Sequence, residues 1–379
     1  MRFRALTAAL LCPALLFLCT VGTAPVKAAA PPGISSLSAV IYEPDSGRVL
    51  YDKDGATRRP MASTTKLMTA LLAAERLAPQ RTVTVPAAAL PVEGTQIGLA
   101  PGDTVTVRDL LAGLLLESGN DAANALALLM ADSMEDFAAM MNGKAAELGM
   151  SHSLFVTPSG LDAGEHGASA RDMAVLGAAV LEHPLLAQLC AAKTATATVG
   201  GRTVTFRNHN KLLRLLEGCV GLKTGFTKKS GRCLVSAAQR DGVTLIVATL
   251  NGGDYWNDHI ALYDYGFSLV HSEPLPTVAP SACPVAGGTA PQVPLTTAPP
   301  PACVLLEGER VSAHVELPRF LWAAVEQGQP VGLVRYTAGE RELCTLPILA
   351  AQTVPTRQPP PWRVLWWQRL CQLTDSLLQ

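Results

Sequence analysis

Segments typical of β-strands fall into two groups, and a long helical region separates them. Near the start, "SAVIYEP" and "VLYDK" flank the turn "DSGR", so β-branched and aromatic residues stand on both sides of a Ser-Gly turn. The second group is "VGLKTGFT", "RCLVSAA" and "VTLIVATL", with Asp241-Gly242 as a hairpin turn between the last two. This order predicts an α/β fold in which one antiparallel sheet is interrupted by a helical insert, within a single unit at about residues 35–270.

The helical region begins at residues 61–75, where Leu67, Met68, Leu71 and Leu72 recur at helical spacing. A helix is expected at 107–116, where Thr106 and Asp109 have the spacing of a capping box. Further helices are expected at 121–130 and in "MEDFAAMMNGKAAELG" and "ARDMAVLGAAVLEH". Most of residues 107–183 is therefore expected to be helical.

The last third of the chain has a different composition. A Pro-rich stretch leads into short strand-like segments, which predicts a small all-β domain at residues 275–352. "TVPTRQPPP" at 353–361 has the composition of a stiff linker. Residues 362–379 are expected to form an amphipathic helix, and its apolar face would carry Trp362, Leu365, Trp366, Leu370, Leu373 and Leu377.

The two tryptophans in that face favour the headgroup boundary of a membrane, and Arg363 and Arg369 can reach anionic lipid. We therefore expect the helix to lie on a membrane surface, too short and polar to be a span. The alternative is a helix that packs on the β domain.

The amino terminus has the layout of a secretory signal, which we place at residues 1–28. Arg2 and Arg4 precede an apolar run, and small residues follow it. A retained membrane anchor fits less well, because the run is short and Pro13 interrupts it. The protein is therefore expected to be exported, to the outer face of the cytoplasmic membrane or the cell wall.

Charge and cysteine content exclude several classes of function. The chain has 30 basic and 31 acidic residues, a formal net charge of -1, and no basic cluster, so nucleic acid is not expected as a partner. Two of the nine cysteines lie in the signal, and the others lack C-x-x-C spacing. Neither a zinc site nor a dense disulfide framework is indicated, so the thiols are expected to be buried or incidental.

Ser63 and Lys66 are three residues apart at the start of an apolar helix, so their side chains can meet. A serine hydroxyl becomes a nucleophile when a base takes its proton, and a buried lysine with a lowered pKa can do this. Alone, S-x-x-K is more often a helix cap followed by a solvated lysine. Two later elements strengthen the catalytic interpretation: "SGN" at 118–120, between two helices, and "KTG" at 223–225, on a strand.

In this order and context, the three motifs resemble those of the penicillin-recognising serine enzymes, and in particular the D-alanyl-D-alanine carboxypeptidases. The resemblance covers roughly residues 36–270, including "TPSGLDAGEHGASARDMA" and "GLKTGFTKKSGRCLVSAAQRDG", and more faintly the β domain. It implies the β-lactamase/transpeptidase-like fold, a peptidoglycan stem peptide as substrate, β-lactam antibiotics as covalent inhibitors, and no metal or cofactor.

By this resemblance, Ser63 is the acylated nucleophile, Lys66 its base and Ser118 the proton relay to the leaving amine. Asn120 would hold a substrate amide. Lys223 and Thr224, in the motif completed by Gly225, would hold the terminal carboxylate. The backbone N–H groups of Ser63 and Phe226 would stabilise the oxyanion.

The implied reaction is removal of the terminal D-alanine through an acyl-enzyme. The alternatives are a transpeptidase or endopeptidase with the same motifs, and a non-catalytic wall-binding module on the same fold. A β-lactamase is disfavoured, because the second motif is S-G-N and no Glu-x-x-x-Asn signature lies between Ser118 and Lys223. The segment "GDYWNDHIALYDYGF" lacks the basic residue that some relatives use nearby, so we expect carboxylate recognition to rest more heavily on Lys223.

Overall fold

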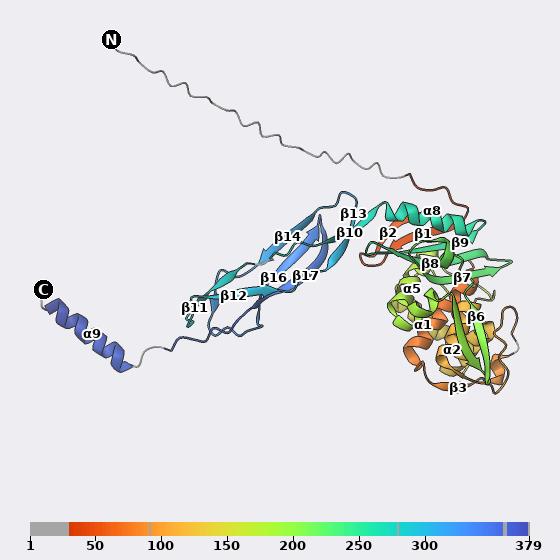
Figure 1. Ribbon diagram of the computed structural model, residues 1–379, viewed down its shortest axis with the longest axis horizontal. Coiled ribbons are helices and arrows are strands. Elements are labelled where there is room, and N and C mark those ends of the chain that lie inside the picture. Colours follow the sequence, from red (N-terminus) through yellow and green to blue (C-terminus); the bar gives the residue numbers. More distant parts are fainter. Residues whose placement is uncertain (1–29, 91, 279, 359–361, 378–379) are drawn as a thin grey trace, which may run out of the picture.

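The structure is a computed structural model that describes residues 30–90, 92–278, 280–358 and 362–377. The expected signal at residues 1–28 lies outside the described residues. The chain forms a large unit, an elongated β-rich part and a carboxy-terminal helix at the far end (Figure 1).

A five-stranded antiparallel sheet lies at the centre of the large unit, in the order β2-β1-β9-β8-β7. The strands are β1 (Ser38–Glu43), β2 (Arg48–Lys53), β7 (Cys219–Thr227), β8 (Gly231–Arg240) and β9 (Val243–Gly252). At the turn between β8 and β9, Asp241 and Gly242 have φ angles of 48° and 78°, as a two-residue type I′ hairpin requires. The predicted pairing of the two strand groups in one antiparallel sheet is confirmed.

Helices of the insert pack on one face of this sheet, and their apolar side chains form the largest core cluster with it. They are the 3-10 turns η1 (Ala62–Thr65) and η2 (Ala87–Ala89), the π-helical turn η3 (Gly113–Glu117), and helices α1 (Lys66–Arg76), α2 (Val107–Ala112), α3 (Asn120–Met130), α4 (Met134–Glu147), α5 (Ala170–Glu182) and α6 (Pro184–Ala191). The short helix α7 (Leu212–Leu215) instead contributes Leu212 to a separate core cluster. As expected, Thr106 caps α2, since its hydroxyl accepts a hydrogen bond from the backbone N–H of Asp109 at 3.1 Å. The helix expected at 61–75 is split into η1 and α1.

The insert also contains a four-stranded sheet that the sequence did not indicate. It consists of β3 (Thr82–Thr84), β4 (Thr104–Thr106), β5 (Thr194–Val199) and β6 (Arg202–Arg207), in that order. These strands alternate threonine with small or apolar residues, so their hydrophobic signal is weak. On the other face of the main sheet, α8 (Tyr255–Phe267) completes a second core cluster.

Beyond α8 the chain enters a two-stranded ladder, β10 (Val270–Pro274) with β13 (Ala302–Leu306). We call the six-stranded sheet beyond it the β module. Its order is β14-β16-β17-β12-β11-β15, with β11 (Ala282–Ala286), β12 (Gln292–Thr297), β14 (Val311–Glu316), β15 (Leu321–Trp322), β16 (Pro330–Ala338) and β17 (Arg341–Ala350). The Pro-rich stretch therefore contributes two strands, and the module has a core cluster of its own.

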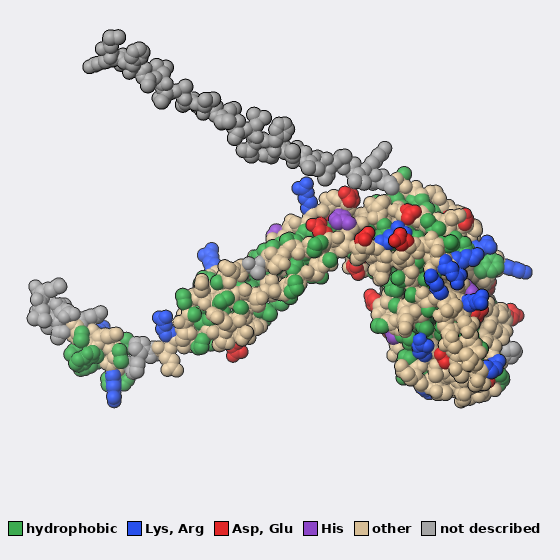
Figure 2. All heavy atoms as spheres, in the orientation of Figure 1, with side chains coloured by type: hydrophobic (Ala, Val, Ile, Leu, Met, Phe, Trp, Pro, Cys, Tyr) green, Lys and Arg blue, Asp and Glu red, His purple; other side chains and the backbone are tan. Residues whose placement is uncertain are grey.

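The chain ends in α9 (Trp362–Leu377), beyond the β module (Figure 1). Trp362, Trp366 and Trp367 are all more than half exposed, so the described part of α9 is not packed on the β module in the way the alternative interpretation required. Hydrophobic side chains gather on this helix in Figure 2. Within the described residues, no single helix has the length and apolar character needed to cross a membrane. Helices α5 and α6 reach that length and apolar character only when taken together, and the chain bends sharply between them.

Candidate active site

Ser63 and Lys66 lie where η1 passes into α1. Ser63 is on the 3-10 turn, and Lys66 is the first residue of α1 and is fully buried. The Lys66 Nζ lies 2.9 Å from the Ser63 Oγ. Ala62, just before the serine, has a φ of 48°, a left-handed conformation that non-glycine residues seldom adopt outside functional sites and turns.

Two further acceptors surround the Lys66 amine. It donates to the Asn120 Oδ1 at 2.7 Å and to the Ser159 carbonyl oxygen at 2.6 Å. Burial, and then the positive charge of Lys223, hold the pKa of Lys66 well below its usual 10.5, while the Asp121 carboxylate opposes them. This shift favours the neutral amine, which is the form that a base requires.

Ser118 and Asn120 are positioned by the end of η3 and the start of α3. Ser118 has a φ of 68°, and this left-handed residue turns the chain into α3. The Asn120 Nδ2 donates to the Glu93 carbonyl oxygen at 2.6 Å, which fixes the amide with its oxygen toward Lys66. Next to it, the Asp121 carboxylate accepts hydrogen bonds from the backbone of residues 97–99 and so anchors the neighbouring loop.

The third motif lies on β7, an edge strand of the main sheet. A Cβ at Gly225 would lie 3.0 Å from the Met61 oxygen and from the Ser63 and Thr64 nitrogens, so only glycine lets β7 approach η1 this closely. Lys223 is buried, and burial lowers its pKa to about 8. Phe226 is 63% exposed.

A cavity of about 390 Å³ brings five of the expected site residues together: Ser63, Ser118, Thr224, Gly225 and Phe226. Of the other three, Lys66 and Asn120 join the site through the hydrogen bonds just described, and Lys223 lies close enough to act on Lys66 through its charge. The same cavity is lined by further residues that were not expected in the site, namely Thr95, His209, Lys211, Arg232, Tyr255 and Trp256.

Arg232 is the most informative of these additional residues. Its guanidinium lies 5.9 Å from the ring centres of both Phe226 and Tyr255. Within the described residues no carboxylate pairs with it. Arg232 faces Phe226 in the β7–β8 register, so the hairpin pairing is the sequence signal that could have placed it beside the K-T-G motif.

The loop that supplies the Ser159 carbonyl is fixed by His166. The His166 Nδ1 accepts from the Val156 N–H at 2.9 Å, and its Nε2 lies 2.9 Å from the Thr65 hydroxyl. Burial lowers the pKa of His166 to about 4, so the ring is neutral. This histidine supports the start of α1 and does not reach the cavity lining.

Comparisons with known proteins identify the family of this chain. The model of the peptidase S11 family, D-alanyl-D-alanine carboxypeptidase, matches residues 25–253. The chain is 38% identical over 238 residues to D-alanyl-D-alanine carboxypeptidase DacB2 of Mycobacterium tuberculosis, covering 61% of this chain and 81% of the relative. It is 31% identical over 336 residues to DacF of Bacillus subtilis, covering 83% and 85%.

Among solved structures, penicillin-binding protein 5 of Haemophilus influenzae aligns with a TM-score of 0.66 at 26% identity, covering 86% of this chain and 99% of that one. The fold and the three motifs define a serine-type enzyme of the penicillin-recognising class. The chain belongs to the peptidase S11 family of D-alanyl-D-alanine carboxypeptidases.

Proposed function

We propose that this protein removes the terminal D-alanine from peptidoglycan stem peptides through an acyl-enzyme on Ser63. The observation that carries the proposal is the buried Lys66 amine at 2.9 Å from the Ser63 hydroxyl. A neutral amine has two N–H groups and one lone pair. Asn120 Oδ1 and the Ser159 carbonyl can only accept, so the lone pair is left for the Ser63 proton.

In the first step, the Ser63 hydroxyl proton moves to Lys66 while the Ser63 Oγ attacks the penultimate carbonyl carbon. The carbonyl oxygen becomes an oxyanion, and the backbone N–H groups of Ser63 and Phe226 are proposed to stabilise it. The tetrahedral intermediate then expels D-alanine, whose amine takes the proton from Lys66 by way of the Ser118 hydroxyl. Water later hydrolyses the ester and releases the shortened peptide.

The terminal carboxylate of the substrate is proposed to bind near Lys223 and Thr224, with Arg232 as a second cation. Lys223 remains largely protonated at pH 7, because its pKa is about 8. Arg232 extends the positive charge to the cavity mouth. A β-lactam carries a carboxylate beside its reactive amide, so the same groups would direct a penicillin to Ser63.

The test is mass spectrometry after incubation with penicillin, and separately with a peptide ending in D-Ala-D-Ala. We expect one adduct on Ser63 and release of D-alanine, and Ser63→Ala should lose both by at least about a thousandfold. Ser151→Ala, in an exposed turn, is the matched control and should retain both. Peptide joining or cleavage of cross-linked stems without D-alanine release would favour a transpeptidase or endopeptidase, and the absence of any adduct would favour a non-catalytic module.

Enzymes of this family work on the wall, so the chain acts in the cell envelope. We infer that it is exported by residues 1–28 and that α9 holds it on the outer face of the membrane. The support is the exposure of Trp362, Trp366 and Trp367 on α9, and the Arg363 guanidinium lies 5.6 Å from the Trp362 ring centre. As Figure 2 shows, hydrophobic side chains gather on this helix.

A chain truncated after Pro361 should keep its activity on a soluble peptide and stop sedimenting with anionic liposomes. The double variant Trp362→Ser with Trp366→Ser should likewise stay active and stop sedimenting with liposomes. Gln368→Ala is the control and should still sediment. Failure of the full mature chain to sediment would contradict the membrane role and leave the catalytic proposal untouched.

A further inference from the structure

Strand β13 lies between the large unit and the β module, and its neighbouring side chains serve different cores. Val304 is buried in the cluster formed by α8 and the back of the main sheet. Cys303, one residue earlier, packs with the core of the β module. Because side chains alternate along a strand, β13 contacts both parts of the molecule.

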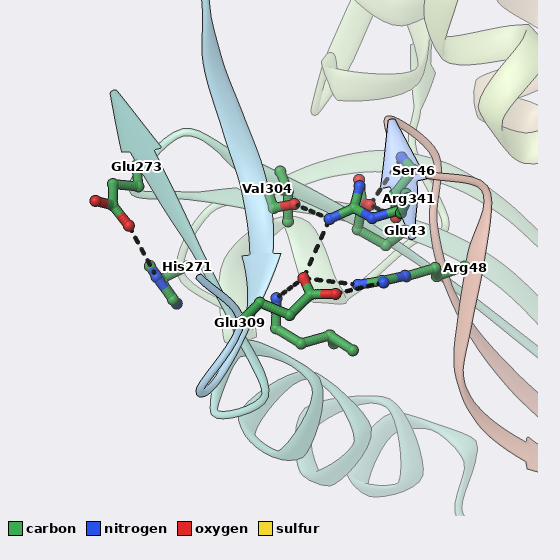
Figure 3. Close-up of polar contacts among 9 residues, drawn as sticks. Glu43, Ser46, Arg48, His271, Glu273, Val304, Glu309 and Arg341 are labelled. Atoms are coloured by element: carbon green, nitrogen blue, oxygen red, sulfur yellow. Dashed lines mark hydrogen bonds and ion pairs between the residues drawn. The ribbon is translucent and has the colours of Figure 1, made fainter. Parts of the chain in front are cut away.

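Polar contacts hold β17 against β13 at this point (Figure 3). The Arg341 Nη2 donates to the Val304 carbonyl oxygen and to the Glu309 carboxylate, both at 3.1 Å. Glu309 also pairs with Arg48 of β2 at 2.5 Å. Cys303, Arg341 and Leu343 line a cavity of only about 90 Å³ here, so β13 and the start of β17 are closely apposed.

Two cysteines meet across this contact. Cys344, three residues after Arg341 on β17, packs against the same core as Cys303, and each thiol affects the pKa of the other, which requires the two side chains to be close neighbours. Both side chains are partly exposed, whereas Cys190, Cys233 and Cys283 are buried.

We propose that Cys303 and Cys344 form a disulfide that fastens the β10–β13 ladder to strand β17 of the β module. The oxidant is a disulfide, protein-bound or small. One cysteine thiolate attacks it and releases a thiol, and the second thiolate then displaces the other half. The two cysteines lose two protons and two electrons, and the oxidant becomes two thiols.

The surroundings favour Cys303 as the attacking thiol. Burial raises the pKa of both thiols, but the charge of Arg341 and the neighbouring Cys344 thiol act in the opposite direction on Cys303. Oxidation should therefore accelerate as the pH rises above neutral, because more thiolate forms. In the cell the bond needs an oxidising compartment, so its occurrence there rests on the proposed export, whereas oxidation of the purified chain does not.

The test uses the mature chain, reduced, desalted and then treated with oxidised glutathione. Tryptic cleavage without reduction should yield residues 241–310 joined to 342–357. The first peptide also contains Cys283, so Cys283→Ser is the matched control and must keep the link. Cys303→Ser and Cys344→Ser must each lose it.

Glutathione adducts on Cys303 or Cys344 without a link between them would overturn the proposal, as would a link that survives Cys303→Ser.

The bond closes a loop of about 40 residues, so the midpoint of thermal unfolding should be at least about 5 °C higher for the oxidised chain than for the reduced chain. Equal midpoints would exclude a fastening role. D-alanine release should be the same in both forms, so that failure of this proposal is distinguishable from failure of the catalytic one.

Discussion

At the scale of single residues, the site depends on two lysines with opposite tasks. Lys66 has to be neutral to accept a proton, and Lys223 has to be charged to attract a carboxylate. Both side chains are buried, and burial is the main cause of the lowered pKa of each lysine. The carboxylate of Asp121 limits the effect at Lys66, and Cys190 and Glu117 limit it at Lys223.

The pH dependence of acylation by penicillin should therefore be bell-shaped. The rate constant should rise as Lys66 loses its proton, at a pH well below 10.5, and fall above about pH 8 as Lys223 loses its charge. Lys223→Arg should keep acylation and move the falling limb above about pH 10, because guanidinium stays protonated. The measurement is the second-order acylation rate constant from pH 5 to 10. An unchanged falling limb in Lys223→Arg would show that another group titrates.

Arg232 should affect substrate binding more than turnover. We expect Arg232→Gln to raise KM for a peptide ending in a free carboxylate by about tenfold, while kcat changes less than about threefold, because the carboxylate that the cation would bind gains no charge as the amide bond breaks. Arg240→Gln is the matched control, since Arg240 lies on the same strand but pairs with Asp264 outside the cavity. A similar KM change in both variants would exclude a specific role for Arg232.

At the scale of elements, the close approach of β7 to η1 assembles the site. Gly225→Val would place carbon atoms within about 3.0 Å of three backbone atoms of η1 and its preceding residue. The strand must then shift, and a displacement of about 1 Å can cost on the order of 100-fold in rate. We expect that loss in penicillin acylation, measured beside a melting curve. Gly143→Ala, in α4 where an added Cβ meets nothing within 4 Å, should leave acylation unchanged; a normal rate in Gly225→Val would show that the approach is dispensable.

At the scale of the whole molecule, the β module lies between the large unit and α9 (Figure 1). The Arg48–Glu309–Arg341 contact links the large unit with the β module (Figure 3). The hydrogen bond from Arg48 lowers the pKa of Glu309 to about 2. A carboxylate with a lowered pKa stabilises the folded state above its unfolded pKa of about 4.5, and this contribution is lost as the pH falls toward 2.

Glu309→Gln should therefore loosen the junction by about 1–2 kcal/mol at pH 7. Hydrogen exchange of the β10 and β13 amides should become faster, and lowering the pH from 5 to 3 should accelerate it in the wild type more than in the variant. Activity on a soluble peptide should not change. Glu342→Gln, which removes an exposed pairing with Arg335 on the same module, is the control and should leave exchange in β10 and β13 unchanged. Equal exchange in wild type and Glu309→Gln would mean that apolar packing alone holds the junction.

Local signals in the sequence were sufficient for the main sheet, most helices and the three motifs. Alternating apolar residues, the Asp241-Gly242 turn and the Thr106 cap act through neighbours in the chain, so their outcome can be predicted without a fold. S-x-x-K puts Ser63 and Lys66 within reach of each other for the same reason. Carboxylate recognition was expected to rest more heavily on Lys223, and the position of Arg232 in the cavity lining is the reason for proposing a second cation there.

Tertiary structure decided what depends on distant parts of the chain. The lowered pKa of Lys66 comes from burial and from Lys223, and its two fixed acceptors, Asn120 and Ser159, lie far from it in sequence. Arg232 enters the site through the β7–β8 pairing, and Cys303 meets Cys344 only when the ladder folds against the β module. Sequence periodicity carries no information on such contacts, because burial, charge and proximity arise only once separate elements pack together.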